Sequence, residues 1–264
     1  DGNHLPAVLR AFDTARQLPD AKPRVILCDT LMGKGVPFLE TREKNHFIRV
    51  DQAEWQQAKA VAVKLYKGQM TSDGSPLHEM QACVTAGLHP NLIRILGRVV
   101  DHPRQQAGLV MQLIAPDYRN LAALPSLDSC SRDLYAPGIR FAPSVALNIA
   151  CGIASAAGHL HEQGITHGDL YGHNTLYNEN GDCLLGDFGA ASFHATQDSF
   201  ESRALQRIEV RAFGVLLGEL LERIDSGLSD QARERLEDLQ RRCCQGDVLA
   251  RPGFSEIVIE LDRI

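Results

Sequence analysis

Three short motifs follow one another in a fixed order from residue 61 onward, and together they constrain the fold more than any other feature. The first is Val61-Ala62-Val63-Lys64, a β-branched, alternating run that predicts a strand bearing one lysine. The second is His167-Gly168-Asp169 followed by Asn174, and the third is Asp187-Phe188-Gly189. Each motif alone is weak, because short strings of this kind occur by chance. Their order and spacing, with Glu79 on a predicted helix between the first two, are specific.

The segments around the motifs predict short strands first and helices later. Strands are expected at 60–66, 95–100 and 109–114, with a helix at 77–86 between the first two. The turn residues 178–182 predict a hairpin over 174–185. Residues 115–140 are expected to form a loop with a short helix, and further helices are expected at 146–163, 206–224, 229–244 and 254–263. This order is typical of an α+β fold with segregated halves.

The motifs resemble the signature set of protein kinases, most closely bacterial Ser/Thr kinases. The resemblance runs from about Ala60 to Ile264 and also takes in His89-Pro90-Asn91-Leu92, Glu209–Val215, Arg251-Pro252 and Phe254. It implies a two-lobe kinase-like fold with a truncated N-lobe, expected at 59–115, and a helical C-lobe at 116–264.

The resemblance also implies a role for each motif residue, since phosphoryl transfer is catalysed mainly by positioning and charge neutralisation. Lys64 would bind the α- and β-phosphates of ATP, and Glu79 would hold Lys64 in an ion pair. Asp187 and Asn174 would bind Mg²⁺ through a carboxylate and an amide oxygen, ligands that suit a hard cation. Asp169 would accept or orient the proton of the substrate hydroxyl.

Two of these assignments leave alternatives open. Glu40 and Glu54 compete with Glu79 as the partner of Lys64. The strand from Leu109 would enter the adenine hinge, with Met111 near the gatekeeper position and the backbone of Gln112 to Ile114 offering hydrogen bonds. An ordinary core strand would have the same pattern.

The glycine-rich loop that covers the phosphates in this family is missing, because residues 45–63 contain no glycine. Loss of such backbone donors costs about 10²–10³ in rate. We therefore expect weakened activity, with binding on the Mg²⁺–phosphate side retained.

The segment 167–174, which the resemblance implies is the catalytic loop, also departs from the family pattern. Gly168 stands where the family has an arginine that pairs with an activation-loop phosphate, so we expect activity without that control. Tyr171 stands in place of the lysine that contacts the γ-phosphate, and His173 is expected to substitute for it in part.

The segment between Gly189 and Glu209 is short and lacks an Ala-Pro-Glu motif. The usual glutamate partner of Arg251 is therefore unassigned, and Glu201 is the nearest candidate. Glu209 replaces an aspartate and is expected still to accept hydrogen bonds from the catalytic-loop backbone. A short segment leaves little platform for a peptide, so the acceptor stays open.

Residues 1–58 have a different character. A helical pattern at 5–17 precedes a buried-strand pattern at 23–30. With Met32–Val36 and Asn45-His46-Phe47, they resemble the end of the thiamine-diphosphate-binding domain of a transketolase, in which the histidine matching His46 lines the substrate channel. The Gly-Asp-Gly and Asn motif that holds metal and diphosphate in that family is absent.

Composition narrows the classes of partner. The 27 Lys and Arg residues against 33 Asp and Glu residues give a net charge of −6. A negative net charge disfavours binding to nucleic acid and to anionic membranes. No apolar run approaches the length that a membrane span needs, about 18–20 residues. The seven cysteines lack zinc-type spacing and predict a reduced, cytoplasmic protein. The oligomeric state stays open.

Three functions remain. The first is an enzyme, an ATP- and Mg²⁺-dependent protein kinase of weakened activity that phosphorylates Ser, Thr or Tyr hydroxyls of a protein substrate. The second is a pseudokinase or nucleotide-binding scaffold. The remote third is a thiamine-diphosphate enzyme fragment.

Overall fold

The computed structural model describes residues 61–66, 75–99, 102, 106–124, 126, 133–197 and 199–264. The chain divides into two compact units, Asp1–Val61 and Ala62–Ile264, and the elements below belong to the second, apart from the first residue of β1. The predicted helix at 5–17, the predicted strand at 23–30 and His46 lie outside the described residues. The fold is α+β, as predicted.

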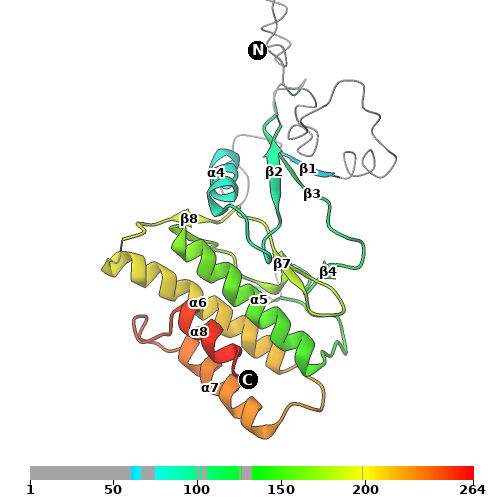
Figure 1. The fold of residues 1–264 in the computed structure, drawn as a ribbon, viewed down its shortest axis with the longest axis vertical. Coiled ribbons are helices and arrows are strands. Elements are labelled where there is room, and N and C mark those ends of the chain that lie inside the picture. Colours follow the sequence, from blue (N-terminus) through cyan, green and yellow to red (C-terminus); the bar gives the residue numbers. More distant parts are fainter. Residues whose placement is uncertain are drawn as a thin grey trace, which may run out of the picture. The chain divides into compact units, whose positions relative to one another are not determined.

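A three-stranded sheet in the order β1-β3-β2 forms the upper part of the described unit (Figure 1). Its strands are β1 (Val61–Leu65), β2 (Ile95–Arg98) and β3 (Gly108–Gln112), and β2 pairs with β3 in antiparallel fashion. Gly108 permits the close approach of β1 and β3, because a Cβ there would lie 2.7 Å from the Lys64 carbonyl oxygen. All three predicted strands are confirmed, and β3 begins one residue before its predicted range.

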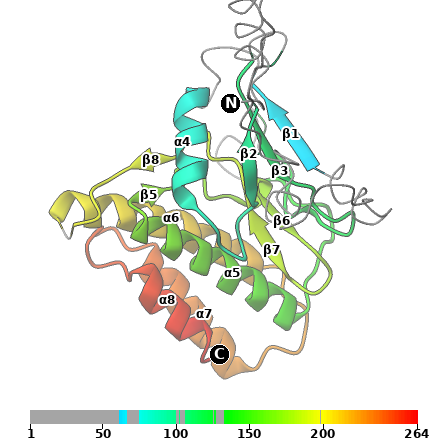
Figure 2. The same cartoon turned by 45° about the horizontal axis from the view of Figure 1, so that its top comes forward.

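One helix, α4 (Pro76–Ala86), lies beside this sheet (Figure 2). It begins with proline in its first turn, where the missing N–H costs nothing. It ends at Gly87, which adopts a φ of 68°. Met80, Ala82, Cys83 and Ala86 are buried, so one face of α4 packs into the core while the Leu77 side of the helix is exposed.

Four helices build the lower part of the unit: α5 (Pro143–Glu162), α6 (Phe200–Leu221), α7 (Asp230–Cys243) and α8 (Phe254–Leu261). Helix α5 packs against α6 and α8, and α6 packs against α7 (Figure 1). Alanines on α5, including Ala150, Ala154 and Ala157, are almost completely buried and let its neighbours approach closely.

Helix α5 corrects one expectation, since its length and composition would allow it to cross a membrane. It is the one such helix among the described residues, and half of its apolar window is buried inside the unit. A central core helix meets the same criterion, and the packing of α5 against α6 and α8 gives its apolar surface a partner.

Helix α6 begins six residues earlier than the predicted start at 206. Ser199 is its N-cap, and the Ser199 side chain accepts a hydrogen bond from the Ser202 N–H at 3.1 Å. This cap satisfies an otherwise unpaired donor of the first turn. Residues 200–205 of α6 therefore lie in sequence that is predicted to belong to the segment after Gly189.

Two further small sheets occur besides the three-stranded sheet and the four helices. The order β4-β6-β7 links β4 (Arg119–Asn120), β6 (Thr175–Tyr177) and β7 (Cys183–Leu185), while β5 (Ile165–Thr166) pairs with β8 (Ser192–Phe193). The predicted hairpin between β6 and β7 is confirmed, and the Asn178 side chain accepts the N–H groups of Asn180 and Asp182 at 3.0 Å. No helix occurs among the described residues of 115–140, so the short helix expected there is not found in them.

Asn91 connects the loop after α4 to β7 and α5. Its side-chain amide donates to the Cys183 carbonyl oxygen at 3.1 Å, and its own carbonyl accepts the Leu185 N–H at 2.8 Å. Gly152 in the middle of α5 faces this junction, because a Cβ there would lie 2.5 Å from the Cys183 sulfur and 2.7 Å from Asn91 Nδ2.

We predict that Gly152→Ala lowers the free energy of unfolding by about 1–3 kcal/mol, the usual cost of overpacking a filled site. Urea unfolding measures the change. The matched control is Gly246→Ala, because nothing lies within 4 Å of a Cβ at Gly246. The control should change stability by no more than about 0.5 kcal/mol, and equal stability of the two variants would contradict the packing at Asn91.

Candidate active site

Lys64 of β1 lies between two carboxylates. Its Nζ is 2.6 Å from Glu79 Oε1 and 3.1 Å from Asp187 Oδ1. Glu79 is buried in the first turn of α4, whereas half of the Asp187 side chain is exposed. The ion pair expected with Glu79 is therefore present. The competing candidates Glu40 and Glu54 lie outside the described residues.

The two carboxylates keep Lys64 charged. Burial lowers the pKa of Lys64, but the hydrogen bond that Lys64 donates to Glu79 and the charge of Asp187 outweigh burial and raise the pKa above its ordinary value of 10.5. Burial, together with the charge of Glu79, raises the pKa of the neighbouring Cys83 thiol to about 12. Cys83 is therefore a protonated packing residue rather than a nucleophile.

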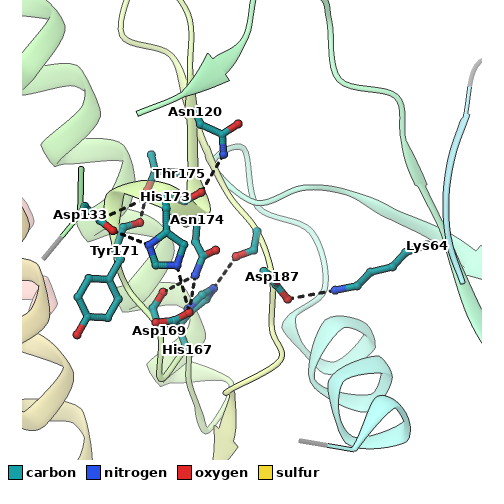
Figure 3. A network of polar contacts seen from close by, with 11 residues as sticks. Lys64, Asn120, Asp133, His167, Asp169, Tyr171, His173, Asn174, Thr175 and Asp187 are labelled. Atoms are coloured by element: carbon teal, nitrogen blue, oxygen red, sulfur yellow. Dashed lines mark hydrogen bonds and ion pairs between the residues drawn. The ribbon is translucent and has the colours of Figure 1, made fainter. Parts of the chain in front are cut away.

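The backbone around Asp187 is held in an uncommon conformation. Asp187 has a φ of 59°, in the left-handed region that aspartate tolerates better than most residues. On one side the Gly186 carbonyl oxygen lies 2.9 Å from Nε2 of the buried His167. On the other side Phe188 is buried against the His167 ring, with 5.1 Å between ring centroids. These contacts fix the direction of the Asp187 carboxylate toward Lys64 (Figure 3).

Asp169 and Asn174 are joined directly in the catalytic loop. Asn174 lies in the short 3₁₀ helix η1 (Gly172–Asn174), and its Nδ2 donates to Asp169 Oδ2 at 2.8 Å and to the Asp169 carbonyl at 3.0 Å (Figure 3). Because the amide nitrogen faces Asp169, the amide oxygen of Asn174 is turned away from it. That oxygen can therefore serve as a cation ligand.

The carboxylate of Asp187 and the amide oxygen of Asn174 suit Mg²⁺ as ligands. Among the described residues no group of three or more His, Cys, Asp or Glu could hold a metal by itself. Mg²⁺ does not require such a group, since it is usually held by one or two protein oxygens together with substrate phosphates. The carboxylate of Asp187 and the amide of Asn174 fit that pattern.

Buried Glu209 of α6 holds the start of the loop. Its Oε1 accepts the Gly168 N–H at 2.8 Å, and its Oε2 lies 2.8 Å from Nε2 of His161. The hydrogen bond expected between Glu209 and the catalytic-loop backbone is confirmed.

Asp133 holds the other end of the loop and was missed by sequence reasoning. Its side chain is fully buried, its Oδ2 accepts the His173 N–H at 3.2 Å, and its Oδ1 lies 2.6 Å from His173 Nδ1. The other ring nitrogen, His173 Nε2, lies 3.5 Å from Asp169 Oδ2 (Figure 3). No motif marks Asp133, because it lies in the irregular segment before α5.

Gly168 could not be the arginine found in the family. Its φ is 78°, and a Cβ there would lie 2.2 Å from the Ala190 carbonyl oxygen. Any side chain would therefore push the segment after Phe188 away from the catalytic loop.

The predicted hinge is only partly available to a nucleobase. Met111 is half-buried at the end of β3, where it pairs with Ile95. The Gln112 N–H already donates to the Arg94 carbonyl oxygen at 2.9 Å. Adenine would have to use other backbone groups of the segment from Gln112 to Ile114.

Arg251 has no carboxylate partner among the described residues, so the suggested pairing with Glu201 is wrong. Its guanidinium is buried and donates to two backbone carbonyls, those of Gln245 and Arg207, at 2.8 Å each. Glu201 is instead exposed in the first turn of α6. Backbone carbonyls thus replace the missing glutamate.

We predict that Gly168→Arg, which restores the family residue, lowers the free energy of unfolding by at least about 1–3 kcal/mol because of the forced φ and the contact with Ala190. Thermal and urea unfolding measure the loss. The control is Gly246→Arg, at a position with open space. Unchanged stability of Gly168→Arg would contradict the geometry of the loop.

The raised pKa of Lys64 predicts a pH dependence. A cation whose folded pKa exceeds its ordinary value adds stability below about pH 10.5 and loses it as the pH rises through the folded pKa. The difference in unfolding free energy between the wild type and Glu79→Gln should be constant near neutral pH and shrink above pH 10.5. A difference that grew at alkaline pH would contradict the pairing.

The comparisons with known proteins agree with the motifs. The family model described as protein tyrosine and serine/threonine kinase matches residues 38–222, well over half of the chain. The match begins before Ala60, where the predicted motifs start, and it ends before α7 and α8.

Individual relatives cover shorter parts. CTD kinase subunit alpha of Schizosaccharomyces pombe is 26% identical over 141 residues, 53% of this chain and 21% of that protein. A serine/threonine-protein kinase of Arabidopsis thaliana is 26% identical over 106 residues, 40% of this chain and 13% of that protein. A transketolase family protein of Sinorhizobium fredii is 59% identical over 58 residues, 22% of this chain and 21% of that protein, which supports the predicted N-terminal fragment.

The chain thus spans about a fifth or less of the length of these relatives. The family model matches a longer part of this chain than any of these three relatives does. On that match the chain belongs to the protein tyrosine and serine/threonine kinase family.

Proposed function

We propose that this chain transfers the γ-phosphoryl group of ATP to a hydroxyl group of a protein substrate. The observation that supports this most is Lys64, held at 2.6 Å from Glu79 and 3.1 Å from Asp187. The ion pair brings a strand, a helix and the Asp187 loop to one point, which is the arrangement that phosphate positioning requires.

Lys64 binds the α- and β-phosphates, and Glu79 keeps its ammonium group in place. Asp187 and the amide oxygen of Asn174 would hold Mg²⁺, which when bound neutralises charge on the phosphate oxygens. Met111, with the backbone from Gln112 to Ile114, borders the adenine. The Gln112 N–H is excluded as a donor, because it is already bonded to Arg94.

Asp169 receives the proton of the acceptor. Its Oδ2 is engaged by Asn174 Nδ2 and lies 3.5 Å from His173 Nε2, which leaves Oδ1 for the hydroxyl. As the hydroxyl oxygen bonds to the γ-phosphorus, the bond from that phosphorus to the β–γ bridging oxygen breaks and the hydroxyl proton passes to Asp169. Tyr171 stands where the family has the lysine that contacts the γ-phosphate. His173, which lies beside Asp169, substitutes for that lysine in part.

The absence of glycine from residues 45–63 supports a weakened rate. The same observation favours the second candidate, a pseudokinase that binds nucleotide without turnover, because the missing loop would contribute to transfer more than to binding. The two functions differ in one measurement, the appearance of transferred phosphate.

The partners proposed are therefore a nucleotide and a protein substrate. A cytoplasmic location agrees with the cysteines, since Cys83, Cys151, Cys183, Cys243 and Cys244 are all unpaired.

We predict that calorimetry detects Mg²⁺-dependent binding of ATP to the wild type and that Asp187→Asn loses the Mg²⁺ dependence. Asparagine tolerates the left-handed backbone of Asp187 and removes only the charge. Asp117→Asn, at an exposed position after β3, is the matched control and should bind as the wild type does. No binding by the wild type, or equal Mg²⁺ dependence in both proteins, would contradict the proposed site.

A further inference from the structure

We infer that the acceptor segment of the substrate carries a bulky aliphatic side chain beside its hydroxyl-bearing residue and an acidic side chain next to that. The inference rests on the proposed function and names the substrate class of the same site. It comes from a cavity of about 400 Å³ beside the catalytic loop.

The position of the cavity ties it to the acceptor. Gly168 and Leu170, the two chain neighbours of Asp169, line it together with Tyr171. Consecutive Cα atoms are about 3.8 Å apart. Asp169 itself does not line the cavity, but its chain neighbours do, so a residue one or two positions from a hydroxyl held at Asp169 can reach it.

The far wall is apolar. It is formed by α6, which presents Leu205, Ile208 and Val215 to the cavity. Leu205 is 40% exposed and Ile208 is 57% exposed, although both are large aliphatic residues beside a catalytic loop. Exposed aliphatic surface gathered at a cavity is typical of a binding surface. An aliphatic side chain of the substrate would bury it.

The early start of α6 adds Leu205 to this wall. Capping by Ser199 extends the helix over residues that we had expected to lie in the segment after Gly189. Leu205 belongs to that extension, and Ile208 follows one turn along the same helix. The acceptor platform is therefore a helix face with fixed side-chain spacing.

The charged side chain of the wall that is accessible to a substrate is positive. Two charged residues line the cavity, Glu209 and Arg211. Both carboxylate oxygens of Glu209 are already engaged, by Gly168 and His161. Arg211 is exposed, and among the described residues it has no hydrogen-bond or ion-pair partner. Charge complementarity therefore selects an acidic side chain, which would also offset the arginine.

The test compares four peptides that share one hydroxyl residue. They carry Leu-Glu, Ala-Glu, Leu-Lys or Ala-Lys beside the hydroxyl, and the full chain is assayed with labelled ATP and Mg²⁺. Leu-Glu should be phosphorylated about tenfold or more faster than Ala-Glu, measured as kcat/KM, since one bulky side chain in an apolar pocket has that effect. Leu-Glu should exceed Leu-Lys by about two- to fivefold, as expected for an exposed pair.

Two variants assign these preferences to the wall. Ile208→Asp should abolish the preference for leucine, and Arg211→Glu should reverse the preference so that Leu-Lys exceeds Leu-Glu. Ile259→Asp is the control, because Ile259 is 51% exposed on α8 and does not line this cavity. Ile259→Asp should leave both preferences as in the wild type.

Peptide binding, measured by fluorescence anisotropy without nucleotide, separates this inference from the proposed function. Binding of Leu-Glu that is lost in Ile208→Asp supports the acceptor site even if no phosphate is transferred, and a lack of transfer would then contradict the kinase activity alone. Equal rates and equal binding for all four peptides would overturn the inference. So would the same preferences in the wild type and Arg211→Glu.

Discussion

Two buried carboxylates, those of Glu209 and Asp133, accept hydrogen bonds from the backbone of the catalytic loop, and the candidate site depends on both. Glu209 accepts the Gly168 N–H at one end, and Asp133 accepts the His173 N–H at the other. A buried carboxylate without partners is costly, so each stays where the loop can donate to it. Asp169 lies between these two points. Its position is therefore set by α6 and by the segment before α5 rather than by its own contacts alone.

A second constraint joins the strands to this loop. Lys64 is attracted by Glu79 from one side and by Asp187 from the other, and its pKa is raised as a result. The three groups together carry one excess negative charge, which a cation would offset. The same geometry explains why the left-handed backbone of Asp187 is retained, since contacts of Gly186 and Phe188 with His167 hold it.

Local patterns predicted most described elements, because α4 and α5 each bury one periodic face and the β6–β7 hairpin is largely buried, whereas Val63 and Leu65 of β1 are exposed. The contact of Lys64 with Glu79 was predicted from the family resemblance rather than from local patterns. The patterns failed where structure depends on distant segments. The role of Asp133 depends on where the irregular segment before α5 passes in the fold. The start of α6, by contrast, is set locally by the N-cap at Ser199, which a pattern of apolar residues does not include. Arg251 donates hydrogen bonds to backbone carbonyls instead of to Glu201, because no carboxylate approaches it among the described residues.

The most direct test of the account is the transfer of labelled γ-phosphate from ATP to protein hydroxyls, followed in a single turnover with the chain in excess. The account predicts slow but measurable transfer by the wild type. Asp169→Asn should reduce transfer by about 10²–10⁴-fold, the range for loss of a general base, while Mg²⁺-dependent ATP binding persists. No transfer by the wild type, or equal transfer by both proteins, would contradict the assignment of this site to phosphoryl transfer.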